Sequence, residues 1–250
     1  GTIASSGFLQ LSVVAASHWG GATGVGNYGA ALALATPASI FAVSLGSALL
    51  PSLSSAHAQG GSAAIARATD RATRGINVVA VCVFGSMVIL AGQLTSILWG
   101  PQFLGSTPVL RVLLIATLLT SCAVPCVTRL SATSTHALAL ATRTSIGGVI
   151  VSAALWVPLG DRLGVTGIAW GYLIGATGTA ATLFVTCWRR DRQNWGWLSV
   201  CTAGAFAILV GVAGLNPSLD PLTAAASAAA FAATYVTVSL LPRFINRQRV

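Results

Sequence analysis

The sequence predicts an all-α, polytopic membrane helix bundle with about eight transmembrane helices. Its 250 residues are 55% hydrophobic and only 7% charged, whereas a soluble domain needs about 25% charged residues to solvate its surface. Apolar runs of about 20 residues, the length that crosses the hydrocarbon core of a bilayer, recur along the whole chain. The 13 basic residues, all arginine, fall at the ends of these runs. The net charge of +9 therefore favours orientation in a membrane over nucleic-acid binding.

Polar breaks divide the chain into eight expected spans. The second span is longer than a bilayer requires and contains Pro37 and Pro51, so we expect a kinked helix that projects beyond the membrane. The eight ranges are 2–19, 28–56, 75–98, 107–128, 137–158, 165–188, 196–214 and 222–241.

The arginines orient these spans. Short cytoplasmic loops carry an excess of positive charge, and only Arg111 and Arg162 fall toward the opposite side when both ends of the chain are cytoplasmic. The chain is thus expected in the cell inner (cytoplasmic) membrane as a multi-pass protein. The arginines at the cytoplasmic ends are Arg67, Arg71, Arg74, Arg129, Arg143, Arg189, Arg190, Arg192, Arg243, Arg247 and Arg249.

The segment 62–76 has two interpretations. Ile65, Ala68, Ala72 and Ile76 share one helical face, and the charged residues of the segment occupy the other. This pattern is typical of an amphipathic helix that lies on the membrane interface. The alternative is a cytoplasmic extension of the third span.

The stretch from Leu159 to Gly175 is glycine-rich but lacks the order of a phosphate-binding loop and follows no expected strand. Gly167, Gly171 and Gly175 instead repeat every four residues. Small residues at that interval let membrane helices approach closely. We therefore expect an outer turn at Asp161 and Arg162, followed by a packing ridge.

Two residue types need no functional explanation at this stage. The five cysteines lie in or at the ends of apolar runs without a redox or zinc spacing, so buried small hydrophobes are expected. Five tryptophans fall at span ends, where an interfacial aromatic belt accounts for them. These are Trp99, Trp156, Trp188, Trp195 and Trp197.

Three stretches carry a family resemblance: "WVPLGDRLGVTGIAWGYLIG" (156–175), "NYGAALALATPASIFAVSLGSALLPSLSSAHAQGG" (27–61) and "ILWGPQFLGSTPVLRVLLIA" (97–116). They resemble segments of polysaccharide flippases of the multidrug/oligosaccharidyl-lipid/polysaccharide exporter superfamily, of the O-antigen and lipid II type. The resemblance implies a second six-helix transport lobe at residues 1–188, with the first lobe absent. Residues 189–250 would then add two further transmembrane helices and a cytoplasmic tail. An intact protein of eight spans is the alternative architecture.

The resemblance implies flipping of a lipid-linked oligosaccharide, or of a cell-envelope precursor such as that of peptidoglycan. The expected partners are the lipid-linked sugar, membrane lipids and envelope glycosyltransferases, with no nucleic acid. A cation-coupled small-molecule or drug exporter and a non-transporting scaffold for envelope synthesis are the alternatives. All four acids lie in loops or near span ends, which favours an anionic substrate over a cationic one. No catalytic triad or metal-ligand cluster is evident, so we expect a transporter without a cofactor.

The candidate substrate-binding residues form two sets. An arginine fork binds phosphate oxygens in pairs, and the candidates of this kind are Arg129, Arg143 and Arg111. Arg129 is expected to face the interior of the lobe and to receive a pyrophosphate. The alternative is an orientation signal at the membrane surface. A polar set surrounds the first outer turn, where the resemblance places a cavity wall: Gln10, His18, Asn27 and Tyr28.

Overall fold

A computed structural model describes residues 2–133, 135–191, 195–215 and 220–247, and these residues are helical apart from short connections. The all-α fold class is therefore confirmed. In chain order the elements are α1 (Thr2–Ile89), α2 (Ala91–Trp99), the 3-10 helix η1 (Pro101–Ser106), α3 (Thr107–Thr133), α4 (Thr135–Leu163), α5 (Val165–Asp191), α6 (Gly196–Leu215) and α7 (Pro221–Arg247).

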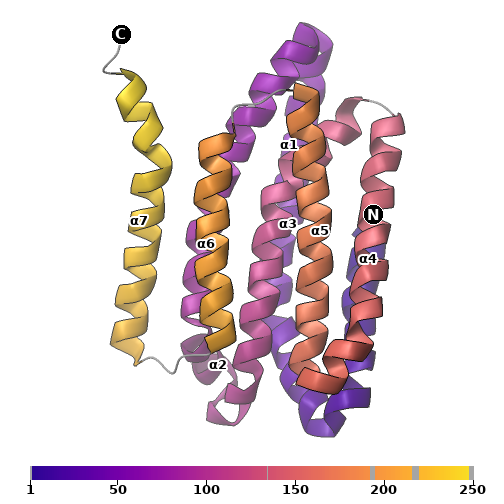
Figure 1. Ribbon diagram of the computed structural model, residues 1–250, viewed down its shortest axis with the longest axis vertical. Helices are drawn as coiled ribbons and strands as arrows, with labels where there is room; N and C mark the ends of the chain where they lie inside the picture. The colour runs from indigo at the N-terminus through magenta and orange to yellow at the C-terminus, as the bar shows by residue number, and fades with distance from the viewer. Residues whose placement is uncertain (1, 134, 192–194, 216–219, 248–250) are drawn as a thin grey trace.

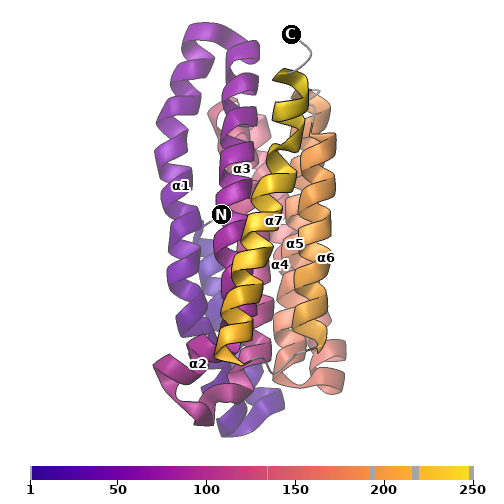
Figure 2. The same ribbon diagram turned by 90° about the vertical axis from the view of Figure 1, so that its left-hand side faces the viewer.

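The long helix α1 consists of three antiparallel arms. Gly21 and Gly61 have positive φ angles of 54° and 62°, a backbone region that glycine enters without steric cost. The chain reverses at both positions (Figures 1 and 2). We call residues 2–20, 22–60 and 62–89 the first, second and third arms. Pro37 and Pro51 lie inside the second arm, which keeps helical backbone angles throughout.

The three arms of α1 and helices α3 to α7 follow the order of the eight expected spans, but the expected third span, 75–98, runs past the end of the third arm into α2. In the described part of the chain, six helical stretches are long and apolar enough to cross a membrane: 60–89, 101–133, 136–163, 165–191, 196–214 and 221–239. The reversal between the second and third arms and the last turns of α3 and α5 lie at the upper end of Figure 1, which we call the Gly61 end. The opposite end is called the Gly100 end.

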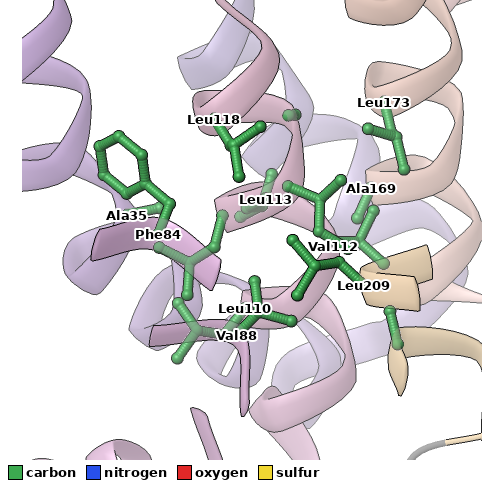
Figure 3. Close-up of a cluster of buried hydrophobic side chains, with 14 of the residues drawn as sticks. Ala35, Phe84, Val88, Leu110, Val112, Leu113, Leu118, Ala169, Leu173 and Leu209 are labelled. Carbon is green, nitrogen blue, oxygen red and sulfur yellow. The ribbon is translucent and has the colours of Figure 1, made fainter. Parts of the chain in front are cut away.

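Helix α3 runs through the middle of the bundle. In its most apolar 18-residue window 83% of the residues are buried, compared with 11% for the corresponding window of α4. Leucine, valine and isoleucine side chains of α3 pack against α1 and α5 (Figure 3). The buried leucine, valine and isoleucine residues of α3 in this core are Val109, Leu110, Val112, Leu113, Leu114, Ile115 and Leu118.

The predicted glycine ridge on α5 is a packing surface, and its partner is α4. A Cβ atom on Gly175 would lie 2.4 Å from the carbonyl oxygen of Gly148, and one on Gly167 would lie 2.0 Å from that of Leu159. Neither position has room for a side chain. The two helices approach closely because packing, rather than hydrophobicity, holds helices together in lipid.

The segment 62–76 is an extension of the following span. No residue between 62 and 89 leaves helical geometry, so the interpretation as a separate interface helix was wrong. Its buried face is also rotated from the expected one, because Thr69 and Thr73 are fully buried with Ile65. Thr69 and Thr73 therefore take the buried positions that were predicted for Ala68 and Ala72.

The last two helices lie along the edge of the bundle. Helix α6 packs on α1 and α3, and α7 packs chiefly on α1 (Figures 1 and 2). Residue 188, where the sequence places the end of the six-helix lobe, falls in the last turn of α5, which continues to Asp191.

Candidate functional site

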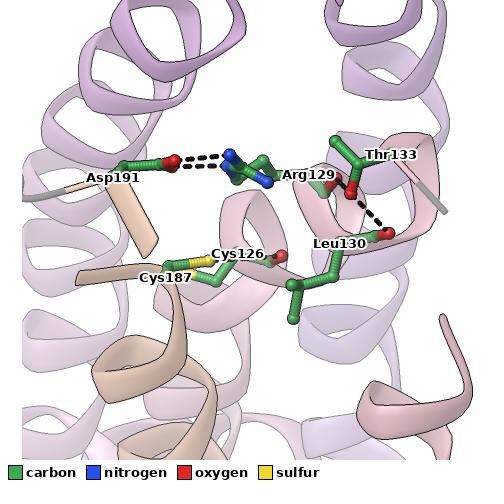
Figure 4. Close-up of polar contacts among 6 residues, drawn as sticks. All are labelled: Cys126, Arg129, Leu130, Thr133, Cys187 and Asp191. Atoms are coloured by element: carbon green, nitrogen blue, oxygen red, sulfur yellow. Dashed lines mark hydrogen bonds and ion pairs between the residues drawn. The ribbon is translucent and has the colours of Figure 1, made fainter. Parts of the chain in front are cut away.

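A buried ion pair joins α3 and α5 near the Gly61 end. Arg129 donates through Nε and one terminal nitrogen to both carboxylate oxygens of Asp191 (Figure 4). The side chains are only 5% and 4% exposed. Cys126 and Cys187 lie one helical turn deeper in the same contact, and the Cys187 thiol is 3.6 Å from the Cys126 carbonyl oxygen. The paired fork is the strong, geometrically specific form of arginine–carboxylate contact.

This geometry changes the interpretation of Arg129. Its guanidinium is buried between α3 and α5, where Asp191 occupies the two donors that a pyrophosphate would use. Among the described residues, its other terminal nitrogen has no hydrogen-bond partner. Removing one member of such a pair leaves an uncompensated buried charge. Arg129 is therefore a structural residue of the α3–α5 contact.

Two other predicted site residues, Arg111 and Tyr28, belong to contacts of their own. Arg111 is 2% exposed near the start of α3, separated from Arg129 by about 27 Å of helix. Tyr28 is fully buried and donates to the Ser12 hydroxyl at 2.8 Å. The candidate residues thus do not converge on one site.

The polar set at the first turn also divides. Asn27 is half-buried and lies close to Gly105, because a Cβ atom added to Gly105 would be 2.9 Å from the Asn27 side-chain nitrogen. His18 is exposed and contacts Trp19 edge to face, with ring centroids 4.8 Å apart. The Gln10 side chain lies outside the described residues.

Arg143 belongs to a different feature, a surface hollow of about 590 Å³ between the beginning of α4 and the end of α5. We call it the basic hollow. The described residues that line it include four basic side chains and no acid. They are His136, Ala137, Ala139, Leu140, Arg143, Thr186, Arg189 and Arg190. Asp191, next in the chain, does not offset this charge because it points inward to Arg129.

A polar cluster that sequence reasoning missed attaches the last two helices. Asn77 on the third arm accepts hydrogen bonds from Tyr235 of α7 and from Thr202 of α6, the latter at 3.1 Å. Its amide group donates to the Cys122 sulfur at 3.6 Å. A single asparagine within an apolar run was the only signal in the sequence for this cluster. Cys122, Cys126 and Cys187 are buried as predicted, whereas Cys82 and Cys201 are only half-buried.

Trp195 corrects the expected aromatic belt. It is 3% exposed, donates to Asp70 at 2.8 Å and stacks edge to face on Phe184. It therefore fixes the start of α6 against the third arm. Trp99, Trp188 and Trp197 remain 40–52% exposed.

Comparisons with known proteins add no family to these observations. No protein-family model matches the chain, and no curated protein matches it. The resemblance to polysaccharide flippases therefore stays a prediction from the three quoted stretches.

Proposed function

We propose that the chain is the second transport lobe, with two additional helices, of a flippase for a lipid-linked oligosaccharide. Six antiparallel helical arms, three from α1 followed by α3, α4 and α5, form the lobe. Helices α6 and α7 add the edge pair. This order agrees with the order of the motifs that carry the resemblance.

The observation that carries the proposal is a difference between two uncovered faces. The first two arms expose hydroxyl and imidazole groups, interspersed with apolar residues such as Val14 and Ile40. Helix α4 exposes Leu138, Ile146, Ile150 and Val157. A polar face costs free energy in lipid but not in a water-filled cavity. In the described part of the first two arms, the exposed hydroxyl and imidazole side chains are those of Ser17, His18, Thr23, Thr36, Ser44, Ser47, Ser52, Ser54 and Ser55.

We therefore place the substrate path along the first two arms and lipid along α4. The partner lobe would complete the cavity wall, because alternating access moves one repeat against another around a shared site. The Gly61 end is cytoplasmic in this proposal, since the basic hollow lies there.

The acids of the chain support an anionic substrate. Asp191 is neutralised by Arg129, and Asp70 pairs with Arg74. Asp161 accepts from Trp19 near the end of α4, and Asp220 is exposed ahead of α7. None of these four described carboxylates is placed to bind a cation midway along a span.

A blocking substitution tests the proposal. Ser44 is exposed on the second arm. Gly46 lies on the opposite side of this arm and faces α3, because a Cβ atom added to Gly46 would lie 3.5 Å from the Val124 side chain. In the full-length protein, Ser44→Trp should abolish restoration of surface polysaccharide in a flippase-deficient strain. Ile150→Trp, on the exposed face of α4, is the matched control and should restore it fully. Equal restoration by both variants, at equal membrane levels, would reject the assignment of the two faces.

A further inference from the structure

The basic hollow gathers positive charge that no neighbouring side chain neutralises in the described part of the chain. His136 and Arg143 are seven residues apart and lie on one face of α4, while Arg189 and Arg190 end α5. The side chains of Arg143, Arg189 and Arg190 are exposed, and like charges brought together repel one another. An anion that lies between these arginines reduces the repulsion.

The end of α4 adds to this preference. The first turns of the 29-residue helix α4 contribute His136, Ala137 and Leu140 to the wall of the hollow. A helix N-terminus carries partial positive charge from its unpaired amide groups. Arginine forks and a helix N-terminus thus converge on one space, and both favour phosphate oxygens.

The surroundings of the hollow indicate an amphiphilic ligand. Arg143 lies about 12 Å along α4 from the helix start, and Ile146 and Ile150 follow it on the same face. These two isoleucines are 47% and 62% exposed, and Val185 on α5 is 44% exposed. An arginine at this depth extends its guanidinium toward the headgroup level while its stem stays in apolar surroundings. The positive charge of the hollow therefore adjoins an exposed apolar surface on α4 and α5.

We propose that the basic hollow binds the phosphate of a bilayer phospholipid, whose acyl chains lie along the exposed face of α4. A volume of about 590 Å³ accommodates a phospholipid headgroup. This site lies on α4 and α5, separate from the substrate path proposed along the first two arms. It holds whether or not the protein is a flippase.

Lipid binding to the purified protein tests this site directly. Native mass spectrometry would count bound phosphatidylglycerol during a titration in detergent. A diacylglycerol with the same acyl chains, which lacks the phosphate, should bind at least about tenfold more weakly. Glycerol phosphate, which lacks the chains, should not displace the bound lipid. Equal binding of diacylglycerol would overturn the proposal, and displacement by glycerol phosphate would reject a lipid in favour of a soluble anion.

A charge-matched pair of variants locates the site. Arg143→Gln with Arg189→Gln should weaken phosphatidylglycerol binding about tenfold or more. Arg67→Gln with Arg71→Gln removes the same charge at the Gly61 end, from exposed positions on the third arm, and should leave the affinity unchanged. Equal losses in the two double variants would show attraction to the protein's overall charge and overturn the site.

Single substitutions keep the test decisive if the first double variant fails to accumulate. Arg143→Gln and Arg189→Gln alone should each weaken binding severalfold. Arg143→Lys should recover part of the loss, because it restores the charge without the planar fork. An unchanged affinity in both single variants would reject the assigned phosphate contacts.

Discussion

Arginine side chains have opposite surroundings on the two sides of α5. Toward α3, Arg129 is buried and paired with Asp191. Toward α4, Arg189 and Arg190 stand with Arg143 in a hollow without an acid among its described lining residues. Both flanks lie in the last turns of one helix. The difference teaches that an arginine at a span end is not by itself evidence for a substrate site, because its role depends on which flank it faces.

The largest effect we expect is from breaking the buried pair. Asp191→Asn leaves the Arg129 charge buried without a counter-charge, and should lower the free energy of unfolding by about 3–5 kcal/mol. Unfolding in mixed micelles measures this change. Arg143→Gln, on the other flank, should stay within about 0.5 kcal/mol of the wild type.

Replacing the whole pair separates charge from packing. Arg129→Met combined with Asp191→Leu removes both charges and should recover most of the lost stability, because apolar residues commonly substitute for a buried pair without loss. If Asp191→Asn alone unfolds like the wild type, the guanidinium reaches water and the contrast between the two flanks fails.

The α4 flank of α5 is sensitive to volume. A Cβ atom on Gly175 would lie 1.9 Å from the Ser152 hydroxyl oxygen as well as against the Gly148 backbone. Gly175→Ala should therefore lower the free energy of unfolding by about 1–3 kcal/mol. Gly178→Ala is the control, because that position is exposed on the same helix and has no neighbouring atom within 4 Å. It should be neutral or slightly stabilising, and a similar loss at both positions would reject the packing ridge.

A neutral buried contact should cost less than either change on α5. Tyr235→Phe removes the hydroxyl that donates to Asn77, while Thr202 continues to donate to the same oxygen at 3.1 Å. We expect a loss of about 0.5–1.5 kcal/mol in unfolding free energy. Thr237→Ala removes an exposed hydroxyl that bonds only within α7, and should change stability by less. Equal losses in the two variants would show that α7 is not docked through Asn77.

Much of the fold followed from the sequence, because span length, arginine placement and four-residue glycine spacing are local patterns with direct structural consequences. The eight helical arms and the α4–α5 ridge are of this kind. The reversals at Gly21 and Gly61 were harder to place, since many glycines lie nearby and only backbone angles distinguish them.

The candidate site was less predictable, because the role of a charged residue depends on distant parts of the chain. Arg129 and Asp191 are 62 residues apart, and nothing local reveals their pairing. The same holds for Trp195, whose position at a span end suggested an aromatic belt although it bonds to Asp70. The basic hollow had a partial signal in the seven-residue spacing of His136 and Arg143, but its completion by α5 required the helix packing.

The smallest effect should come from a second ion pair of the same chemistry at lower burial. Arg74 contacts Asp70 at 3.0 Å one turn away on the third arm, with side chains 32% and 31% exposed. Arg74→Gln should cost only about 0.3–0.5 kcal/mol, as for other helix pairs of this spacing, because water screens the charges. Asp70 also keeps its hydrogen bond from Trp195. Arg71→Gln, at an exposed neighbouring position, controls for loss of charge alone.

In 1 M salt the cost of Arg74→Gln should vanish, since the screening length falls to about 3 Å, whereas that of Asp191→Asn should persist. Equal salt sensitivity in the two variants would show that burial does not distinguish the pairs.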